Sequence, residues 1–237
     1  MKNRISNILA TILLLGFLTI PARAEVEYAI GIAAHSGTFE TTGQEKEGYN
    51  LINIQPIEEN NSGVISEDVD FGAAFIEIVG RDGWQGMTVG LEYIPGTASM
   101  GAKTRTDSDG DTSDDADTGD YTGKAEVSDH ITLYFEPTIY PTENFGIYGK
   151  LGVSHASGRS LENIDKGASS STYGDFDLTG ATYGFGLRAK VGLFMIKTDW
   201  YKTEYKEVSL ESGTGNKNRI TARPEHEGAR IAIGLQF

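Results

Sequence analysis

Apolar and polar residues alternate along most of this chain with a period of two, the pattern of extended strands that have one apolar face. In residues 229–237, one face carries Ile231, Ile233, Leu235 and Phe237. The first run, 26–35, alternates in the same way, and six more lie between, at 69–79, 84–94, 128–140, 145–155, 176–189 and 193–205. Eight strands of about ten residues each are expected of a small closed β-barrel.

The run 69–79 is the least regular of these. Ile76 and Ile78 fall on the face opposite Phe71, Ala73 and Phe75. One extra residue in the strand would bring both sets to a single face, so the pattern predicts a β-bulge here.

The connections between the runs alternate in length. Those at 81–83, 141–144 and 191–192 are tight, whereas those at 36–68, 95–127, 157–175 and 206–227 are long. With an even number of strands, this rhythm places both termini and the tight turns at one end and the long connections at the other. Transmembrane barrels of the bacterial outer membrane have this asymmetry, with short periplasmic turns and longer external loops.

The polar face of the runs decides which side points inward. It mixes several glycines with seven long charged residues: Glu92, Glu136, Lys150, Arg188, Lys197, Asp199 and Arg230. A solvated strand surface has no need of glycine, but the narrow lumen of a small barrel does, because small residues make room for large ones. The apolar face then meets lipid, with Tyr93, Phe145, Trp200 and Phe237 near strand ends as interfacial girdles. The predicted fold is therefore an all-β, eight-stranded antiparallel up-and-down transmembrane β-barrel over residues 25–237.

Composition narrows the function classes. Of 237 residues, 34 are acidic and 20 basic, and none is cysteine. The formal charge of -14 argues against a nucleic-acid partner, and the absence of cysteine excludes a disulfide-stapled or thiolate-metal scaffold. Residues 1–24 have the pattern of a secretory signal peptide: Lys2 and Arg4, an apolar stretch over 8–20, and the small residues Ala22 and Ala24.

The signal sequence, the alternating strands and the C-terminal run Ile231-Ala232-Ile233-Gly234-Leu235-Gln236-Phe237 resemble the small eight-stranded outer-membrane barrels of Gram-negative bacteria, the OmpA-like, OmpX-like and opacity-protein class. The resemblance implies a location in the outer membrane among its lipids. It also implies that Phe237 is the signal recognised by the barrel assembly machinery. We expect a scaffold of this kind to need no cofactor.

The inward charges have two interpretations. Structural pairing is the first, since a lone buried charge is costly and a paired one tolerable. A narrow, cation-favouring ion path in which the pairs exchange partners is the second.

An acidic run holds the candidate residues for weak divalent-cation binding: Asp107, Asp109, Asp111, Asp114, Asp115 and Asp117. Hard cations take several oxygen ligands from one flexible segment. The run lacks the EF-hand pattern, because Thr112 stands where glycine is needed and Thr118 where glutamate is needed. The alternative is a solvated loop tip.

A further alternative is an enzyme. His155 and Ser157, with Glu162 nearby, resemble the His-x-Ser pair and separate glutamate of lipid A 3-O-deacylases, in which a histidine base activates a serine. Gly158 stands where that family typically has asparagine. A strand end without chemistry is the competing interpretation, and the sequence favours a protein that is not an enzyme.

The connections 36–68 and 95–127 together carry a net charge of -11, a field that favours cations or basic partners. The sequence thus predicts a closed outer-membrane scaffold whose surface loops serve envelope integrity or surface binding.

Overall fold

The computed structural model describes residues 25–46, 60–107, 119–164, 173–211 and 219–237. In this part of the chain all regular elements are strands, and no helix is long and apolar enough to cross a membrane. The strands are β1 (Glu25–Lys46), β2 (Asn60–Asp82), β3 (Gln85–Asp107), β4 (Gly119–Thr142), β5 (Phe145–Ile164), β6 (Asp175–Val191), β7 (Phe194–Tyr205), β8 (Val208–Glu211) and β9 (Arg219–Gln236).

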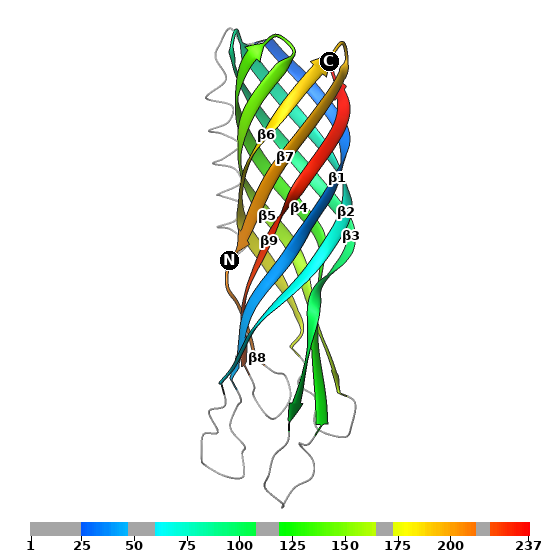
Figure 1. Cartoon of the computed structure of the whole chain (residues 1–237), viewed down its shortest axis with the longest axis vertical. Coiled ribbons are helices and arrows are strands. Elements are labelled where there is room, and N and C mark those ends of the chain that lie inside the picture. The colour runs from blue at the N-terminus through cyan, green and yellow to red at the C-terminus, as the bar shows by residue number, and fades with distance from the viewer. Residues whose placement is uncertain (1–24, 47–59, 108–118, 165–172, 212–218) are drawn as a thin grey trace, which may run out of the picture.

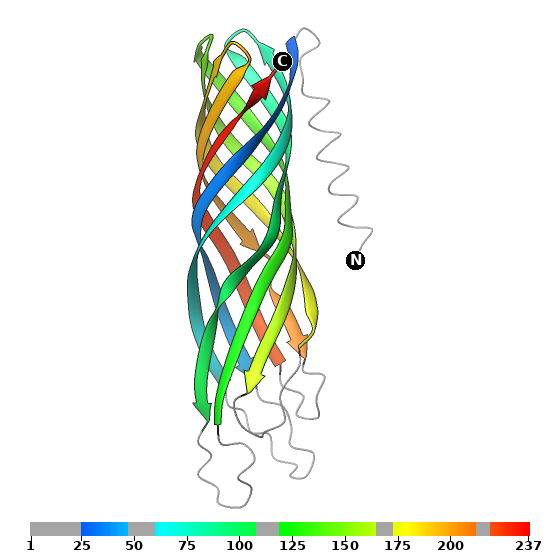
Figure 2. The same ribbon diagram turned by 90° about the vertical axis from the view of Figure 1, so that its right-hand side faces the viewer.

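The strands form one antiparallel sheet that closes on itself. Neighbours in the sheet follow chain order from β1 to β7, β9 lies next to β7, and β9 also pairs with β1 from Ala29↔Gln236 to Lys46↔Arg219. The short β8 pairs with the outer part of β9 and stands outside the ring of eight. The result is a tall barrel of tilted strands, with the tight turns and the C-terminus at one end (Figures 1 and 2). The predicted eight-stranded up-and-down barrel is confirmed.

The tight turns fall close to their predicted places, at 83–84, 143–144 and 192–193. Gly83 and Gly192 have φ of 60° and 61°, left-handed values that glycine adopts without a steric penalty. Trp84, which the sequence placed at the start of a strand, lies in the first turn and is exposed.

The strands run much farther from the turns than predicted. Much of each segment predicted as a long loop is strand: β1 continues to Lys46 and β2 begins at Asn60. The alternation of inward and outward residues continues there, but the apolar residues now point inward and the polar residues outward. In β1, Ile30 and Ile32 point outward, whereas Phe39, farther out, points inward and is buried. A search for one continuous apolar face stops at this reversal, which is why the outer halves were predicted as loops.

The same reversal accounts for the irregularity in β2, where the predicted bulge is wrong. β2 pairs with β1 without interruption from Asn60 to Arg81. Phe71 and Phe75 both point into the barrel, while Ile76 points out. The register shifts lie instead in β3 and β4, at Ile94/Thr97, Ser99/Ala102, Ser128/Ile131 and Ile139/Thr142.

Candidate functional site

The barrel half nearest the turns holds a cross-barrel network of charged side chains. All seven predicted lumen residues are buried there, with Lys197 and Glu136 at 0% exposure and Arg230 at 1%. They come from six strands, β3 to β7 and β9. We call the set the lumen network, and it includes one carboxylate that the sequence did not single out, Glu77 of β2.

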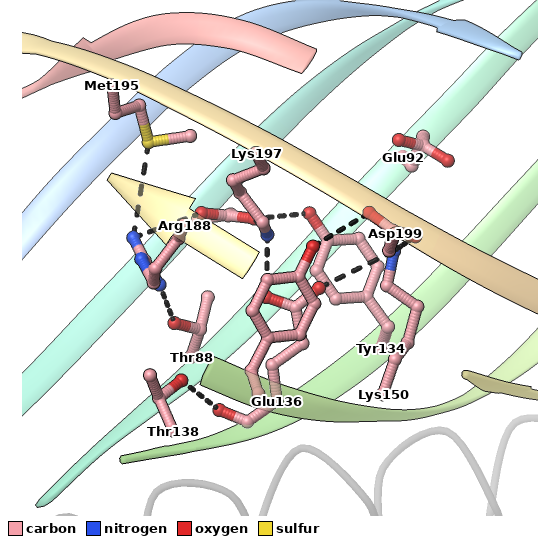
Figure 3. Close-up of polar contacts among 12 residues, drawn as sticks. Thr88, Glu92, Tyr134, Glu136, Thr138, Lys150, Arg188, Met195, Lys197 and Asp199 are labelled. Atoms are coloured by element: carbon pink, nitrogen blue, oxygen red, sulfur yellow. Dashed lines mark hydrogen bonds and ion pairs between the residues drawn. The ribbon is translucent and has the colours of Figure 1, made fainter. Parts of the chain in front are cut away.

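Lys197 lies at the centre of one part of the lumen network. Its ammonium group contacts the Glu77 carboxylate and lies 2.6 Å from Oε2 of Glu136 (Figure 3). The Tyr134 hydroxyl donates a hydrogen bond to Glu77 at 2.8 Å. Arg188 lies 3.9 Å from the second Glu77 oxygen. Each ion in this part therefore has an opposite charge within reach.

Asp199 organises the other part. One of its oxygens lies 2.7 Å from Nζ of Lys150 (Figure 3). The other lies 3.0 Å from Nη1 of Arg230. The Tyr148 hydroxyl donates to the same carboxylate at 2.7 Å. Nε of Arg230 lies 2.7 Å from Glu92. Lys150 also lies 3.5 Å from Glu136, which joins the two parts into one network.

The lumen network is electrically balanced. Four carboxylates face four cations: Glu77, Glu92, Glu136 and Asp199 against Lys150, Arg188, Lys197 and Arg230. Removal of a charge from water is costly, so this balance is what makes eight buried ions tolerable in a narrow lumen. All eight residues are at most 6% exposed.

Glycines on the inner face make room for the large side chains, as the sequence predicted. A Cβ on Gly90 would overlap the Tyr134 ring, and one on Gly186 would lie 2.6 Å from atoms of both Tyr148 and Asp199. In β1, a Cβ on Gly31 would meet the Phe75 ring. These contacts show why glycine recurs on the side that carries the charges.

A layer of histidines and aromatic rings follows the lumen network on the outward side. The Tyr201 hydroxyl lies 3.1 Å from Nδ1 of His35 and 3.4 Å from Nε2 of His226. His226 stacks on Phe39 with ring centroids 4.5 Å apart, and His35 stacks on Phe71 at 4.7 Å. His226 lies outward of the apolar exterior of β9, and burial lowers its pKa to about 3, so its ring is neutral at ordinary pH.

The outermost interior is apolar, like the core of a soluble protein. Its buried residues come from β1 and from β3 to β7: Phe39, Met100, Val127, Ala156, Leu178 and Tyr205. Val69 and Phe176 pack against this outer core. The barrel thus has a charged interior near the turns and an apolar interior farther out.

The exterior changes from apolar near the turns to acidic farther out, the opposite of the interior. Near the turns it is an apolar belt of exposed side chains: Ile30, Ile32, Ile76, Ile139, Ile147, Leu151, Phe185, Leu187, Ile196, Ile231, Ile233 and Leu235. Farther out it is an acidic collar: Asp68, Asp70, Asp129, Glu204, Glu225 and Glu227. Polar interior, apolar exterior and closed edges are the properties that a β-sheet needs in order to cross hydrocarbon.

Aromatic residues mark the boundary between the apolar belt and the acidic collar. Tyr93 donates a hydrogen bond to Asp129 at 3.0 Å, and Tyr183 donates to Glu204 at 2.8 Å. At the opposite rim, Phe145 and Phe237 are exposed among the turns. Aromatic rings at both rims are typical of membrane interfaces, where the ring meets apolar chains and the polar group meets water.

The structure describes the His155–Ser157 pair in full and only one end of the acidic run, the two alternative sites that the sequence suggested. His155 and Ser157 both lie on the exterior of β5, where Ser157 is exposed and lines a groove of about 280 Å³ together with Arg159 and Asp175. Nδ1 of His155 faces the Thr179 hydroxyl at 3.4 Å, and no His155–Ser157 hydrogen bond occurs in the described part of the chain. Of the acidic run, Asp107 is the last residue of β3, whereas 108–118 lie outside the described residues.

Other predicted residues are placed by the fold but not assigned a role. Phe237 is exposed, and its backbone exchanges hydrogen bonds of 2.9 and 2.8 Å with Tyr28 of β1. Its part in assembly stays a prediction, and the predicted signal peptide, 1–24, lies outside the described residues. Among the residues that the structure describes, no group of three or more histidine or carboxylate side chains is arranged to hold a metal ion.

Comparison with known proteins yields likenesses of fold. No family model matches the chain, and no curated protein matches it significantly. Ail, the attachment invasion locus protein of Yersinia pestis, solved with the heparin analogue sucrose octasulfate, is 11% identical, with 89% of this chain and 99% of that chain covered and a TM-score of 0.38. A major outer membrane protein of Thermus thermophilus is 12% identical, with 86% and 99% covered and a TM-score of 0.38.

Neisserial surface protein A is 11% identical over 88% of this chain and 97% of that chain, with a TM-score of 0.29. At this identity the likenesses concern the fold alone, and no ligand follows from them. The chain itself is a closed, eight-stranded antiparallel β-barrel with the polar interior and apolar exterior of a small transmembrane barrel.

Proposed function

We propose that this protein is an integral outer-membrane barrel of a Gram-negative bacterium, a closed scaffold that presents an acidic surface for envelope integrity or for surface binding. The observation that carries the proposal is the reversal of polarity along the strands. Near the turns the barrel is built for lipid, and beyond Tyr93 and Trp200 it is built for water, with an apolar core inside and carboxylates outside.

The outer part of the barrel supports a binding role because its strands stay paired beyond the apolar belt. Strands β1 and β2 remain paired out to Lys46↔Asn60, and β3 and β4 out to Asp107↔Gly119. The residues that flank 47–59 and 108–118 therefore lie in paired strands well beyond the apolar belt.

The lumen network supports a closed scaffold over a channel. The cavity that contacts this network, lined by Glu92, Lys150 and Arg230 among others, has a volume of only about 20 Å³. An ion that passed would have to separate buried pairs, and separating one such pair costs about 3–5 kcal/mol. We therefore expect no unitary currents from the folded protein in planar bilayers.

Location and closure are tested together by membrane fractionation followed by gel electrophoresis of unboiled and boiled samples. The proposal predicts an outer-membrane band that migrates faster before boiling. Protein found in the soluble fraction without detergent would refute it.

The binding role is tested on intact cells that carry the full chain. Replacing 47–59 and 108–118 with short Gly–Ser turns leaves the paired strands in place. We expect this variant to keep its heat-modifiable band but to lose adherence to polylysine-coated surfaces, because part of the acidic surface is removed. Replacement of 165–172, a part of the predicted connection 157–175, serves as the matched control for shortening a connection. Equal adherence of wild type and of the 47–59 and 108–118 variant would refute a binding role for these connections.

A second candidate is a hydrolase acting on lipid A. The observation in its favour is that His155 and Ser157 share the exterior of β5 at the outer rim of the apolar belt, beside the groove that Ser157 lines. Against it, His155 faces Thr179. Mass spectrometry of lipid A from cells with and without the protein decides the matter. An acyl chain lost from lipid A in cells with the wild-type protein, and retained with Ser157→Ala, would favour the enzyme. Unchanged lipid A would refute it.

A further inference from the structure

The barrel wall has a gap between β2 and β3 just outside the apolar belt. Their ladder extends from Asp82↔Gln85 to Ala74↔Tyr93 and stops there, although both strands continue outward. β3 turns aside at Pro95 and Gly96, where its register with β4 shifts and Gly96 has φ of 94°. The strands contact each other again farther out, where a Cβ on Gly101 would overlap the Ile65 side chain. We call the gap between these points the side window.

A cavity of about 70 Å³ lies in the side window. It is lined by outward-facing residues at its mouth, including Asp70 and Thr97, and by inward-facing ones behind them. The inward lining includes Phe39, Phe71 and Ile94. Because one cavity contacts both faces of the wall, it leads from the exterior toward the lumen. Its inner lining is mostly apolar and could accept part of a hydrocarbon chain or ring.

The inner end of the cavity is polar and incompletely satisfied. His130 and His226 line both this cavity and the smaller one of about 20 Å³ that contacts Arg230. Both ring nitrogens of His130 and Nη2 of Arg230 are buried and have no hydrogen-bond partner among the described residues. Arg230 itself is only 1% exposed. A buried, unpartnered guanidinium N–H is uncommon in a folded protein and calls for an acceptor.

We propose that the side window is a binding site for a small amphiphile with a carboxylate head and a single apolar chain. The apolar part contacts Phe39, Phe71 and Ile94. The carboxylate points inward to His130, which takes up one proton on binding so that the lumen stays electrically balanced, and it accepts a hydrogen bond from Nη2 of Arg230. The remainder of the chain leaves the window beside Tyr93, at the rim of the apolar belt, where lipid chains begin.

The chemistry of His130 and Arg230 favours a carboxylate over other head groups. A guanidinium N–H only donates, so it prefers an oxygen acceptor, and a carboxylate accepts more strongly than a hydroxyl. An ammonium head would leave Nη2 unsatisfied. The narrow cavity excludes branched and two-chain lipids, because about 90 Å³ in the two cavities together accommodates only the head and first carbons of one chain.

The test uses the full-length folded protein in phospholipid nanodiscs and octanoate as the probe, measured by isothermal titration calorimetry near neutral pH. We expect saturable binding of one octanoate per protein. 1-Octanol, which has the same chain without the charge, should bind at least tenfold more weakly, because a hydrogen bond to a charged group contributes about 1.5–3 kcal/mol.

Three variants locate the site. Ile94→Trp fills the cavity from inside and should abolish saturable binding, and Thr97→Trp covers the mouth from the exposed side with little risk to folding. His130→Phe keeps an aromatic ring but removes the polar contact, so it should weaken octanoate about tenfold and leave 1-octanol unchanged. Leu151→Trp, on the exterior of β5 away from the side window, is the matched control and should bind as the wild type does. Each variant is first shown to be heat-modifiable.

Clear outcomes would overturn the proposal. Absence of saturable octanoate binding would mean that water alone occupies the cavity. Equal affinity for octanoate and 1-octanol would refute recognition of the head. Unchanged binding in both the Ile94→Trp and Thr97→Trp variants would place any site elsewhere. None of these results bears on whether the barrel resides in the outer membrane, so failure here is separate from failure of the proposed function.

Discussion

Replacing Lys197 with methionine tests whether the lumen network is a dry, mutually dependent set of ions. Methionine has a similar length but no charge, so the change removes one cation and little volume. Lys197, Glu77 and Glu136 are all at 0% side-chain exposure. After the change, Glu77 keeps the Tyr134 hydroxyl at 2.8 Å, and Glu136 keeps only Lys150 at 3.5 Å. The lumen then holds one uncompensated negative charge.

The expected loss in the free energy of unfolding follows from this one uncompensated charge. Removing one partner of a buried ion pair costs about 3–5 kcal/mol, because the remaining charge stays out of water. The free energy of unfolding should fall by this amount in Lys197→Met. Adding Glu136→Gln restores the charge balance, so the double variant should be more stable than the sum of the single changes by about 1–3 kcal/mol.

The assay is urea unfolding and refolding in phospholipid vesicles, followed by the gel mobility of unboiled samples. The matched control is Lys202→Met, the same substitution on the exterior of the same strand. Lys202 pairs with Glu225 at 2.7 Å, but the two side chains are 23% and 42% exposed. An exposed pair contributes about 0–1 kcal/mol. If both substitutions cost the same, water screens the lumen and the closed-scaffold reasoning is wrong.

Three further predictions concern other parts of the barrel. Gly186→Ala should destabilise by about 1–3 kcal/mol in the same assay, because its Cβ would lie 2.6 Å from packed side chains, whereas Gly149→Ala, with nothing within 4 Å, should not. Ile32→Arg, at a site 62% exposed in the apolar belt, should cost about 2–4 kcal/mol in vesicles, and Thr42→Arg, exposed beyond the belt, should cost little. Burial lowers the pKa of His226 from 6.5 to about 3, so unfolding takes up a proton at any pH between these two values. The contribution of His226 to the free energy of unfolding should therefore be intact above pH 6.5 and fall by up to about 1.4 kcal/mol per pH unit toward pH 3. His226→Phe should reduce this slope.

The sequence alone predicted the number of strands, the positions of the tight turns and the side of the sheet that faces inward. These features depend on local geometry, because side chains alternate across a strand whatever the strand pairs with. The same rule identified seven of the eight ions of the lumen network. It missed Glu77 because an assumed bulge left the face of β2 undecided, although unbroken alternation from Phe71 to Glu77 would have placed it inside.

Tertiary structure decided which charges meet. Arg230 and Glu92 are 138 positions apart, and Lys197 and Glu136 are 61 apart. Their contacts depend on the tilt and stagger of a closed ring, which no local period encodes. The outer extension was also decided at this level, because its strands alternate like the others but reverse their polarity where the exterior changes from apolar to acidic. The side window exists only because two strands that are neighbours in the sequence stop pairing at Ala74 and Tyr93.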